Sequence, residues 1–192
     1  MPRASRAESE RTRARIVDVA RTAFTAHGYQ GVGLERIARD AGVTRGAVYH
    51  HFADKEALFA AVLDGVQASV AERIVAATAD VSDPRRSLEI GSRAFLEACL
   101  ADANRRILLV DAVAVLGWDV WREHDARHGG RTLTHVLGQL ADADRLRGLD
   151  PAAAAVLLSG AMNEAAVWAA TAGGDLEAAW AVLERLIDAV AE

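Results

Sequence analysis

The chain has 192 residues, of which 52% are hydrophobic, enough for one medium domain or for a small domain joined to a larger one. Ala, Leu and Val supply most of this content, and there are only three prolines, so the composition favours helices over strands. With one cysteine, Cys99, and a formal net charge of −5, the sequence excludes an internal disulfide framework and a cysteine-based zinc finger, and we expect a reducing, cytoplasmic compartment.

The N-terminal part is positively charged although the whole chain is acidic. Between residues 1 and 52, nine arginines and five acidic residues give a net charge of +4, which leaves −9 for the remainder. We expect this part to face a polyanion; the alternative is a chance excess in a genome that uses Arg in place of Lys. The stretch before residue 16 lacks the apolar core of a secretory signal, so we expect no export.

The spacing of apolar residues predicts a first helix that ends near Gly28. Its apolar stripe consists of Ile16, Val17, Ala20, Ala23 and Phe24. Gly28 can adopt the left-handed conformation that is common after a helix, and His27 lies beside the negative helix end.

Two shorter helices follow, joined by a turn of about three residues. The segment 34–41 has apolar residues at helical spacing and is ended by Gly42, and the hydroxyl of Thr44 is expected to cap the next helix. In that third helix, Val48 and Phe52 fall one turn apart and point inward. This pattern is typical of a helix-turn-helix.

The opposite face of the third helix has no apolar core residue. It consists of Arg45 and Gly46, with Tyr49 and His50 one turn later. Asp54 is expected to cap a fourth helix whose first residue is Lys55, the only lysine. Free backbone N–H groups and the ammonium would together suit a phosphate at this helix start.

The stretch from about Arg13 to Phe59 resembles the DNA-binding domain of the tetracycline-repressor (TetR) family. The family motif contains an apolar helix, "GY", and then "IA..AGVS.G..Y.HF..KE.L". This chain matches it at Gly28, Tyr29, Ile37, Ala38, Ala41 to Thr44, Gly46, Tyr49, His51, Phe52, Lys55, Glu56 and Leu58. The resemblance implies an all-α protein with an N-terminal three-helix helix-turn-helix DNA-binding domain, residues 1–54, followed by a C-terminal helical ligand-binding and dimerisation domain, residues 55–192.

The resemblance also implies which residues contact DNA. The implied site consists of Thr44, Arg45, Gly46, Tyr49, His50 and Lys55. Arg45 and Gly46 would face the major groove, Tyr49 and His50 mainly phosphates, and Lys55 a phosphate at the next helix start. Many members have two hydroxyl residues where this chain has Val32 and Gly33, which leaves Gly33 as a weak cap. The tail that holds Arg3 and Arg6 is expected either to enter a minor groove or to stay solvated.

The remainder of the chain predicts further helices separated by short breaks. The expected segments are 55–80, 84–102, 104–116, 118–146, 151–172 and 175–191, with Asp83-Pro84 and Asp150-Pro151 as two of the starts. The stretch after Pro151 has the length of a membrane span but contains Asn163 and Glu164, so we expect a buried or interfacial helix and no membrane contact.

The last two predicted helices are too apolar for a small domain to cover alone. In the TetR family they pair with their copies, so the resemblance implies a homodimer that binds a palindromic operator of double-stranded DNA. The alternative is that these helices only close the core of the monomer.

The middle helices are expected to hold an unidentified small-molecule effector, as in the family. Candidate lining residues are those that put aromatic or polar groups on apolar helices: Phe95, Cys99, Leu108, Asp111, Trp118, Trp121, Met162, Asn163 and Trp168. Each of them would alternatively be a core residue, and Asn163 and Glu164 would alternatively bond across an interface.

A rival interpretation is a helical ligand-binding or metal-dependent protein without a transcriptional role. His124 and His128 lie one turn apart, a spacing compatible with a metal, and Asp125 or Asp111 would supply oxygen. No further ligand is marked, and no nucleophile elbow, phosphate loop or dinucleotide fingerprint is present. We therefore expect a transcriptional repressor that is not an enzyme and has no metal or cofactor.

Overall fold

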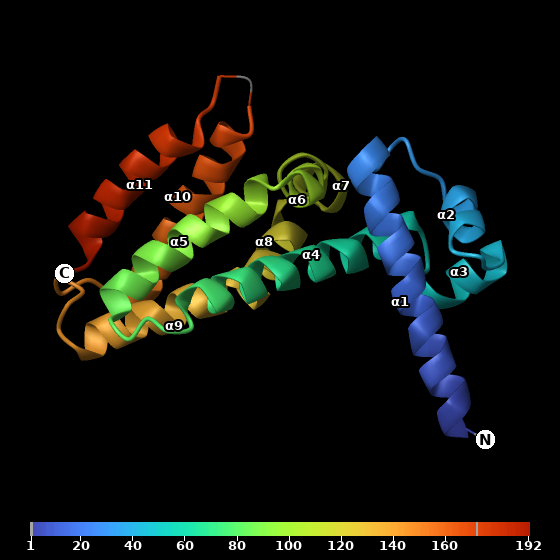
Figure 1. The fold of residues 1–192 in the computed structure, drawn as a ribbon, viewed down its shortest axis with the longest axis horizontal. Coiled ribbons are helices and arrows are strands. Elements are labelled where there is room, and N and C mark those ends of the chain that lie inside the picture. The colour runs from blue at the N-terminus through green and yellow to red at the C-terminus, as the bar shows by residue number, and fades with distance from the viewer. Residues whose placement is uncertain (1, 172) are drawn as a thin grey trace.

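The structure is a computed structural model that describes residues 2–171 and 173–192, and the side chains of residues 2–5 and of Trp118 lie outside the described part. Throughout the described residues the chain is helical, without β-strands. Figure 1 shows a small N-terminal group of helices at one end and a larger C-terminal group at the other, with the long helix α4 running between them. The expected all-α architecture is thus confirmed.

The N-terminal group contains three helices that meet around an aromatic core. They are α1 (Pro2–His27), α2 (Leu34–Asp40) and α3 (Arg45–His51). The rings of Phe24 and Phe59 pack edge to face at 5.4 Å, and Tyr29 lies 5.2 Å from Phe59. Gly28 and Gly42, which follow α1 and α2, both have positive φ, the conformation expected after a helix.

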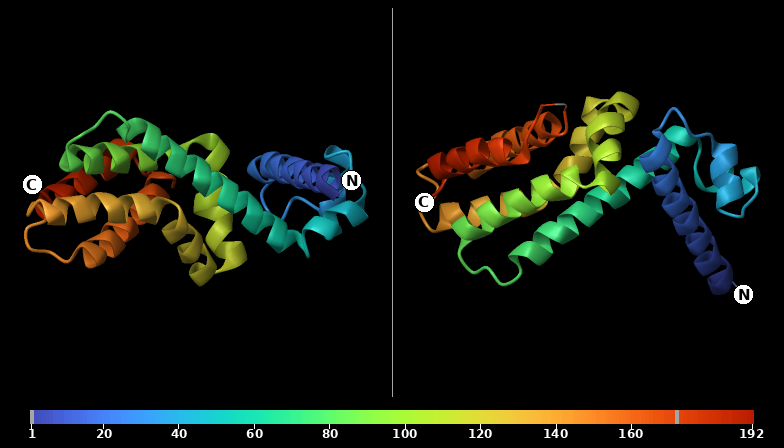
Figure 2. Two further views of the ribbon diagram at one scale, coloured as in Figure 1. Left: turned by 90° about the horizontal axis from the view of Figure 1, so that it is seen from below. Right: turned by 45° about the horizontal axis from the view of Figure 1, so that its top comes forward.

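Helix α1 is longer than the apolar stripe predicts, because it begins at Pro2. Its first turns project beyond the other helices (Figure 2), and Arg6 pairs with Glu10 one turn later at 3.3 Å. The N-terminal segment is therefore helical, whereas the sequence predicts either an arm that enters a minor groove or a solvated tail. The side chain of Arg3 lies outside the described residues.

Among the described residues, the C-terminal group is built on α4 and seven further α-helices, with one π-helical turn among them. These are α4 (Lys55–Thr78), α5 (Pro84–Leu100), α6 (Asp102–Arg105), η1 (Arg106–Asp111), α7 (Ala112–Leu116), α8 (Trp118–Arg127), α9 (Gly129–Asp142), α10 (Pro151–Ala169) and α11 (Leu176–Val190). Helices α5, α9 and α10 pack against one another, α4 lies along α5, and α11 covers α10 and α5. The two groups share one continuous core through α4.

Side-chain caps start most of the longer helices where the sequence predicts them. The carboxylates of Asp54, Asp83 and Asp150 accept from the backbone N–H three residues later, at 2.7, 2.9 and 2.7 Å. Pro84 and Pro151 each occupy the first turn of their helix, where no N–H is needed.

Two segments that the sequence predicts as single helices are interrupted in the structure. The segment 104–116 is divided into the end of α6, the π-helical turn η1 and α7. The segment 118–146 is two helices, because the backbone leaves the helical conformation at His128, and the following Gly129 and Gly130 favour such a break. The second of them ends at Asp142.

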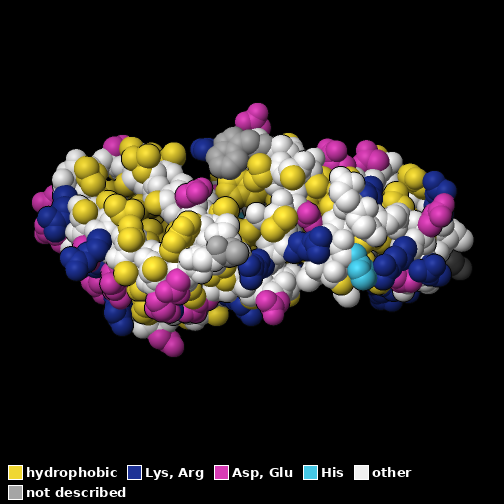
Figure 3. All heavy atoms as spheres, turned by 90° about the horizontal axis from the view of Figure 1, so that it is seen from above, with side chains coloured by type: hydrophobic (Ala, Val, Ile, Leu, Met, Phe, Trp, Pro, Cys, Tyr) yellow, Lys and Arg dark blue, Asp and Glu magenta, His cyan; other side chains and the backbone are white. Residues whose placement is uncertain are grey.

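Helix α10 is long and apolar enough to cross a membrane, judged by length and composition alone. Only 28% of its most apolar stretch is buried within the monomer. On its outward side Leu157 is 74% exposed, and α11 adds Val182 at 63%. Figure 3 shows hydrophobic side chains gathered over the face that α10 and α11 form. This face is therefore an exposed apolar surface of the monomer, of the kind found at interaction sites.

Hydrogen bonds join the N-terminal group to the segment after α5. The backbone N–H of Tyr29 donates to Asp111 Oδ2 at 3.0 Å, and Arg21 donates to Asn104 Oδ1 at 3.0 Å. Gly28 leaves room for the guanidinium of Arg106, which lies where a Cβ would stand. Segments that are far apart in sequence are thereby fixed side by side.

A second set of polar contacts joins α4 to α8. Asp64 Oδ1 lies 2.8 Å from Nε2 of His128 and 3.5 Å from Nδ1 of His124, and Arg127 approaches it at 3.7 Å. Burial alone would raise the pKa of Asp64, but the hydrogen bond to His128 and the charges of His128, His124 and Arg127 lower it below its ordinary value of 3.8.

We expect Asp64→Asn to lower the free energy of unfolding by at most about 1 kcal/mol, because the cluster is partly exposed to solvent. A carboxyl with a depressed folded pKa stabilises the fold above its unfolded pKa, and this contribution is lost as the pH falls through the folded value. Urea unfolding across acidic to neutral pH should show the difference from wild type above about pH 4 and its disappearance below. Glu8→Gln, which removes an exposed carboxyl of α1, serves as the control. A difference that persists unchanged at low pH would contradict this electrostatic account.

Candidate functional site

The short helix α3 presents one buried and one exposed face. Its cap is formed as predicted: Oγ1 of Thr44 accepts from the N–H of Ala47 at 3.1 Å. Val48 and, just beyond the helix, Phe52 are buried in the core. The residues of the opposite face, Arg45, Gly46, Tyr49 and His50, are all exposed. The structure therefore brings the predicted DNA-contacting residues of α3 together on one solvent-facing surface.

Arg45 already has partners on this surface. Its guanidinium donates to Oε1 of Glu35 at 2.6 Å and to the hydroxyl of Tyr49 at 3.4 Å, and it lies over the Tyr49 ring. The hydrogen bond to Tyr49 and then the charge of Glu35 raise the pKa of Arg45. Sequence reasoning missed Glu35, because the two residues belong to different helices and only the fold brings them together. Any ligand of Arg45 must compete with this carboxylate.

Lys55 lies at the start of α4 and bonds to the loop between α1 and α2. Its Nζ donates to the carbonyl oxygens of Tyr29 and Val32, at 2.9 and 3.1 Å, and lies 4.0 Å from the centre of the Tyr29 ring. An ammonium has three donors, so one remains after these two bonds. Lys55 thus has a structural role that the sequence did not predict, beside the expected contact with an anion.

The positions of Val32 and Gly33 in the structure account for the departure from the family motif at these two residues. Val32 is buried in the core, so an apolar side chain suits its position. Gly33 occupies the N-cap of α2, as expected for a weak cap, and no side-chain bond satisfies the N–H groups of that helix start.

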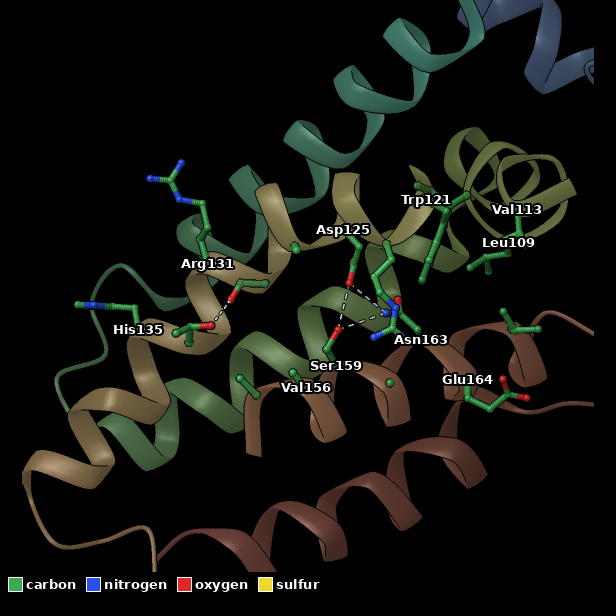
Figure 4. Close-up of a pocket in the computed structure, with 18 residues that line it drawn as sticks. Leu109, Val113, Trp121, Asp125, Arg131, His135, Val156, Ser159, Asn163 and Glu164 are labelled. Carbon is green, nitrogen blue, oxygen red and sulfur yellow. Dashed lines mark hydrogen bonds between the residues drawn. The ribbon is translucent and has the colours of Figure 1, made fainter. Parts of the chain in front are cut away.

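A cavity of about 550 Å³ lies in the C-terminal group, among η1, α8, α9 and α10 (Figure 4). Its lining residues are Leu108, Leu109, Val113, Trp121, Arg122, Asp125, Ala126, Gly130, Arg131, Thr134, His135, Ala155, Val156, Ser159, Gly160, Asn163, Glu164 and Val167. The volume is within the range of pockets that enclose drug-sized molecules.

Three of the predicted lining residues, Leu108, Trp121 and Asn163, lie on the wall of this cavity. Phe95 and Met162 line a small hollow next to it, and Cys99 lines another together with Phe95. Burial raises the pKa of the Cys99 thiol, so this cysteine remains protonated and unreactive.

Asp111 and Trp168 lie elsewhere, and Trp118 lies outside the residues whose side chains are described. The carboxylate of Asp111 accepts from Tyr29 and lies 3.7 Å from Arg106, so it faces the N-terminal group and not the cavity. Trp168 is 45% exposed on the outer side of α10. The expectation that Asp111 and Trp168 line the cavity is thus corrected, because polarity on an apolar helix does not reveal which side of the helix it lies on.

The cavity contains a carboxylate that the sequence did not single out as a lining group. Asp125 Oδ2 accepts from the hydroxyl of Ser159 at 3.0 Å and from the amide of Asn163 at 3.2 Å. Burial raises the pKa of Asp125, while these two bonds and the charge of Arg122 act in the opposite direction. A usable signal was its position one turn after Trp121 on the same face of a helix.

Nδ1 of His124 and Nε2 of His128 both approach the same oxygen of Asp64, at 3.5 and 2.8 Å. Among the residues that the structure describes, no group of three or more His, Cys, Asp and Glu side chains is arranged to hold a metal ion.

Comparison with family models and known proteins relates both parts of the chain to one family. Residues 16–62 match the model for bacterial regulatory proteins of the tetR family, and residues 86–190 match the tetracyclin repressor-like C-terminal domain. The HTH-type transcriptional regulator AcrR of Shigella flexneri is 34% identical over 110 residues, which are 57% of this chain and 51% of the relative. The match therefore spans about half the length of that curated relative.

Solved structures match over nearly the whole chain. A TetR-family transcriptional regulator from Pectobacterium atrosepticum is 34% identical and superposes with a TM-score of 0.84, covering 97% of both chains. The transcriptional regulator FadR from Bacillus subtilis, solved in complex with stearoyl-CoA, is 19% identical, with a TM-score of 0.72 over 91% of this chain and 96% of that one. At this identity the second likeness shows the fold alone.

We expect Asp125→Asn to stabilise the protein against urea near neutral pH. The asparagine keeps an oxygen that accepts from Ser159 and Asn163 but removes a buried charge. Because the folded pKa is raised above 3.8, the carboxyl favours folding while it is protonated, and this contribution is lost as the pH rises through the folded value.

The stability difference between Asp125→Asn and wild type should therefore be present at about pH 7 and should close as the pH is lowered below 3.8. Glu123→Gln removes an exposed charge from the same helix and should leave the pH profile unchanged. A less stable Asp125→Asn protein at neutral pH would mean that the ionised carboxylate stabilises the fold, contrary to this expectation.

Proposed function

Since the chain belongs to the TetR family of bacterial regulatory proteins, we propose that it is a transcriptional repressor that binds a palindromic operator as a homodimer and leaves it when a small molecule binds. The observation that carries this proposal is the exposed polar face of α3, joined through α4 to a helical group with a cavity. The relatives reported above are named as transcriptional regulators, so we propose no enzymatic reaction and no cofactor.

The proposed DNA site comprises Thr44, Arg45, Gly46, Tyr49, His50 and Lys55. Arg45 would leave Glu35 to donate to a guanine in the major groove, because its fork of donors fits the acceptors of that base. Tyr49 and His50 would contact phosphates from the same face, and Lys55 would use its remaining donor. A side chain at Gly46 would project into the space between protein and DNA, so glycine permits close approach.

The proposed homodimer uses the outward face of α10 and α11. This face exposes Leu157, Val182 and Leu186, with alanines between them that allow helices to approach closely. One short recognition helix contacts few base pairs, so specific binding needs two of them on half-sites about one helical turn apart. A dimer that covers this face also explains the apolar character of α10 without membrane contact.

We further propose that the protein is cytoplasmic and is organised in two domains, residues 1–54 and 55–192.

The proposed effector site is the cavity among η1, α8, α9 and α10. Leu108, Trp121 and Asn163 line it, and Phe95, Cys99 and Met162 line the hollows beside it. The turn η1 places Leu108 and Leu109 at the cavity and Asp111 against Tyr29. An effector that binds better to a form in which η1 is displaced would thereby disfavour the DNA-binding arrangement.

The decisive experiment is selection of random duplex DNA with the purified protein, run in parallel with Tyr49→Ala. An enriched palindrome that the variant fails to recover would support the dimeric regulator. If a folded dimer enriches no sequence at low salt, the transcriptional role is contradicted, and a helical ligand-binding protein becomes the better description.

We expect Arg45→Ala, Tyr49→Ala and Lys55→Ala to weaken DNA binding in different ways. Arg45→Ala should reduce discrimination at one operator position by about 1–3 kcal/mol, whereas the other two should weaken binding to all sequences. Affinities for the selected operator and for a scrambled duplex measure this, with Arg73→Ala on α4 as the control. Equal loss of discrimination in all three variants would contradict this division of roles.

We expect Leu157→Glu to convert the dimer to a monomer, because a charge in the centre of an apolar interface is costly to bury. Sedimentation velocity should show the smaller species, with helical content unchanged in circular dichroism. Val75→Glu, which alters an exposed valine of α4, should leave the dimer intact. If Leu157→Glu remains a dimer, the interface lies elsewhere.

A further inference from the structure

Arg13 lies where α1 passes beside the end of α3. The two helices are in contact (Figure 1), and Arg13 lies one turn before the buried Ile16, on the side of α1 that faces the core of the N-terminal group. Its guanidinium lies over the ring of Phe52, 5.1 Å from the ring centre, and Phe52 is the residue that follows α3. Arg13 itself is exposed. One face of the guanidinium therefore covers an aromatic ring of the core, while the N–H donors along its edge face the solvent.

Two histidines complete a cluster of basic side chains at this place. His50 and His51 are the last residues of α3, and their rings lie 5.2 Å apart, edge to face. The ring of His51 is also 6.4 Å from that of Phe52. Arg45 on the same helix is paired with a carboxylate at 2.6 Å, but within the described part of the chain no carboxylate pairs with Arg13, His50 or His51. The cluster is thus a basic site without its own counter-ion.

The charges in this cluster oppose one another. Burial, and then the positive charges of His50 and Arg13, lower the pKa of His51 below its ordinary value of 6.5. The charged groups that act on His51 are therefore both positive, one from its own helix and one from α1. An anion placed among these three side chains would relieve their repulsion and accept their hydrogen bonds. A phosphate group has the charge and the acceptor oxygens for this position.

We propose that Arg13 and His51, together with His50, hold one phosphate of the DNA backbone, and that His51 takes up a proton as the DNA binds. The proposal rests on the proposed function, in which the exposed face of α3 contacts the duplex, and it extends that surface to α1. Arg13 is charged at every pH, whereas His51 adds its charge only when it is protonated.

Proton uptake links the DNA affinity to pH. A phosphate raises the pKa of the imidazole beside it, so the complex holds more protons than the free protein. The gain in affinity is therefore fully present below the pKa of His51 in the free protein, and it is lost as the pH rises through the pKa in the complex.

The phosphate contact is tested by the salt dependence of DNA binding. Fluorescence anisotropy with the full-length protein gives affinities for the selected operator and for a scrambled duplex over a range of NaCl concentrations. We expect Arg13→Gln to weaken binding to both duplexes equally and to reduce the magnitude of the salt slope by about one. Arg13→Lys should restore the slope, because it keeps the charge. Arg15→Gln removes an exposed arginine about 200° around α1 and should behave as wild type.

The proton uptake is tested by the same measurement between pH 5.5 and pH 8 at constant ionic strength, where circular dichroism confirms that the protein is folded. We expect wild type to bind the operator about fivefold more tightly at the lower pH, the effect of one charge pair near the surface. His51→Gln should reduce this difference to about twofold or less. His128→Gln, which removes a histidine of the C-terminal group, should retain it.

A titration of the free protein tests the cluster without DNA. The pKa of the His51 imidazole, followed by NMR, should rise in Arg13→Gln because a positive neighbour has been removed, and it should not change in Arg15→Gln.

An unchanged salt slope in Arg13→Gln would overturn the proposal, because a side chain that only packs on Phe52 leaves the slope as it is. So would a pH effect that persists in His51→Gln, or a His51 pKa that is indifferent to Arg13. If the DNA selection enriches a palindrome that Tyr49→Ala fails to recover while Arg13→Gln binds as wild type does, the proposed function stands and only its extension to α1 fails. If wild type binds no duplex, both fail together.

Discussion

The position of the recognition helix α3 depends on the packing of α1 against the beginning of α4. With seven residues, α3 is far shorter than the ~12 residues at which isolated helices become marginally stable. Phe24 from α1 and Phe59 from α4 pack together in the core that also contains Val48 of α3, and Lys55 bonds to the loop that leads into α2. The orientation of α3 is therefore determined by its surroundings rather than by its own helix formation.

Tyr29 connects this arrangement to the rest of the molecule. Its N–H donates to Asp111 of η1, and its carbonyl accepts from Lys55 of α4. The backbone of Tyr29 thus bonds both to η1, which lines the cavity, and to the first residue of α4, the helix that follows the N-terminal group. A displacement of η1 would act directly on the loop before α2, so the two groups are coupled by a short physical path.

Local signals predicted much of this structure, and contacts between distant residues account for what they missed. Caps, glycine turns and apolar spacing act within a few residues, which is why Thr44, Asp54, Asp83 and Asp150 were identified correctly. The break between α8 and α9 coincides with Gly129 and Gly130, whose weak helix preference the apolar spacing does not register, and the π-helical η1 leaves no mark in that spacing. The partners of Arg45, Asp111 and Asp125 come from other helices or loops, so no periodicity could reveal them.

The pairing of Arg45 with Glu35 changes how the positive charge of the N-terminal part should be counted. An arginine that is already neutralised by a neighbouring carboxylate attracts few counterions of its own on approach to DNA. In the proposed complex, Arg45 exchanges Glu35 for a base edge and leaves a carboxylate near the duplex. Breaking the ion pair costs the same free energy on every sequence, so only a base that binds the guanidinium better than Glu35 does recovers that cost. The contact therefore lowers the contribution of Arg45 to the general attraction between the protein and DNA.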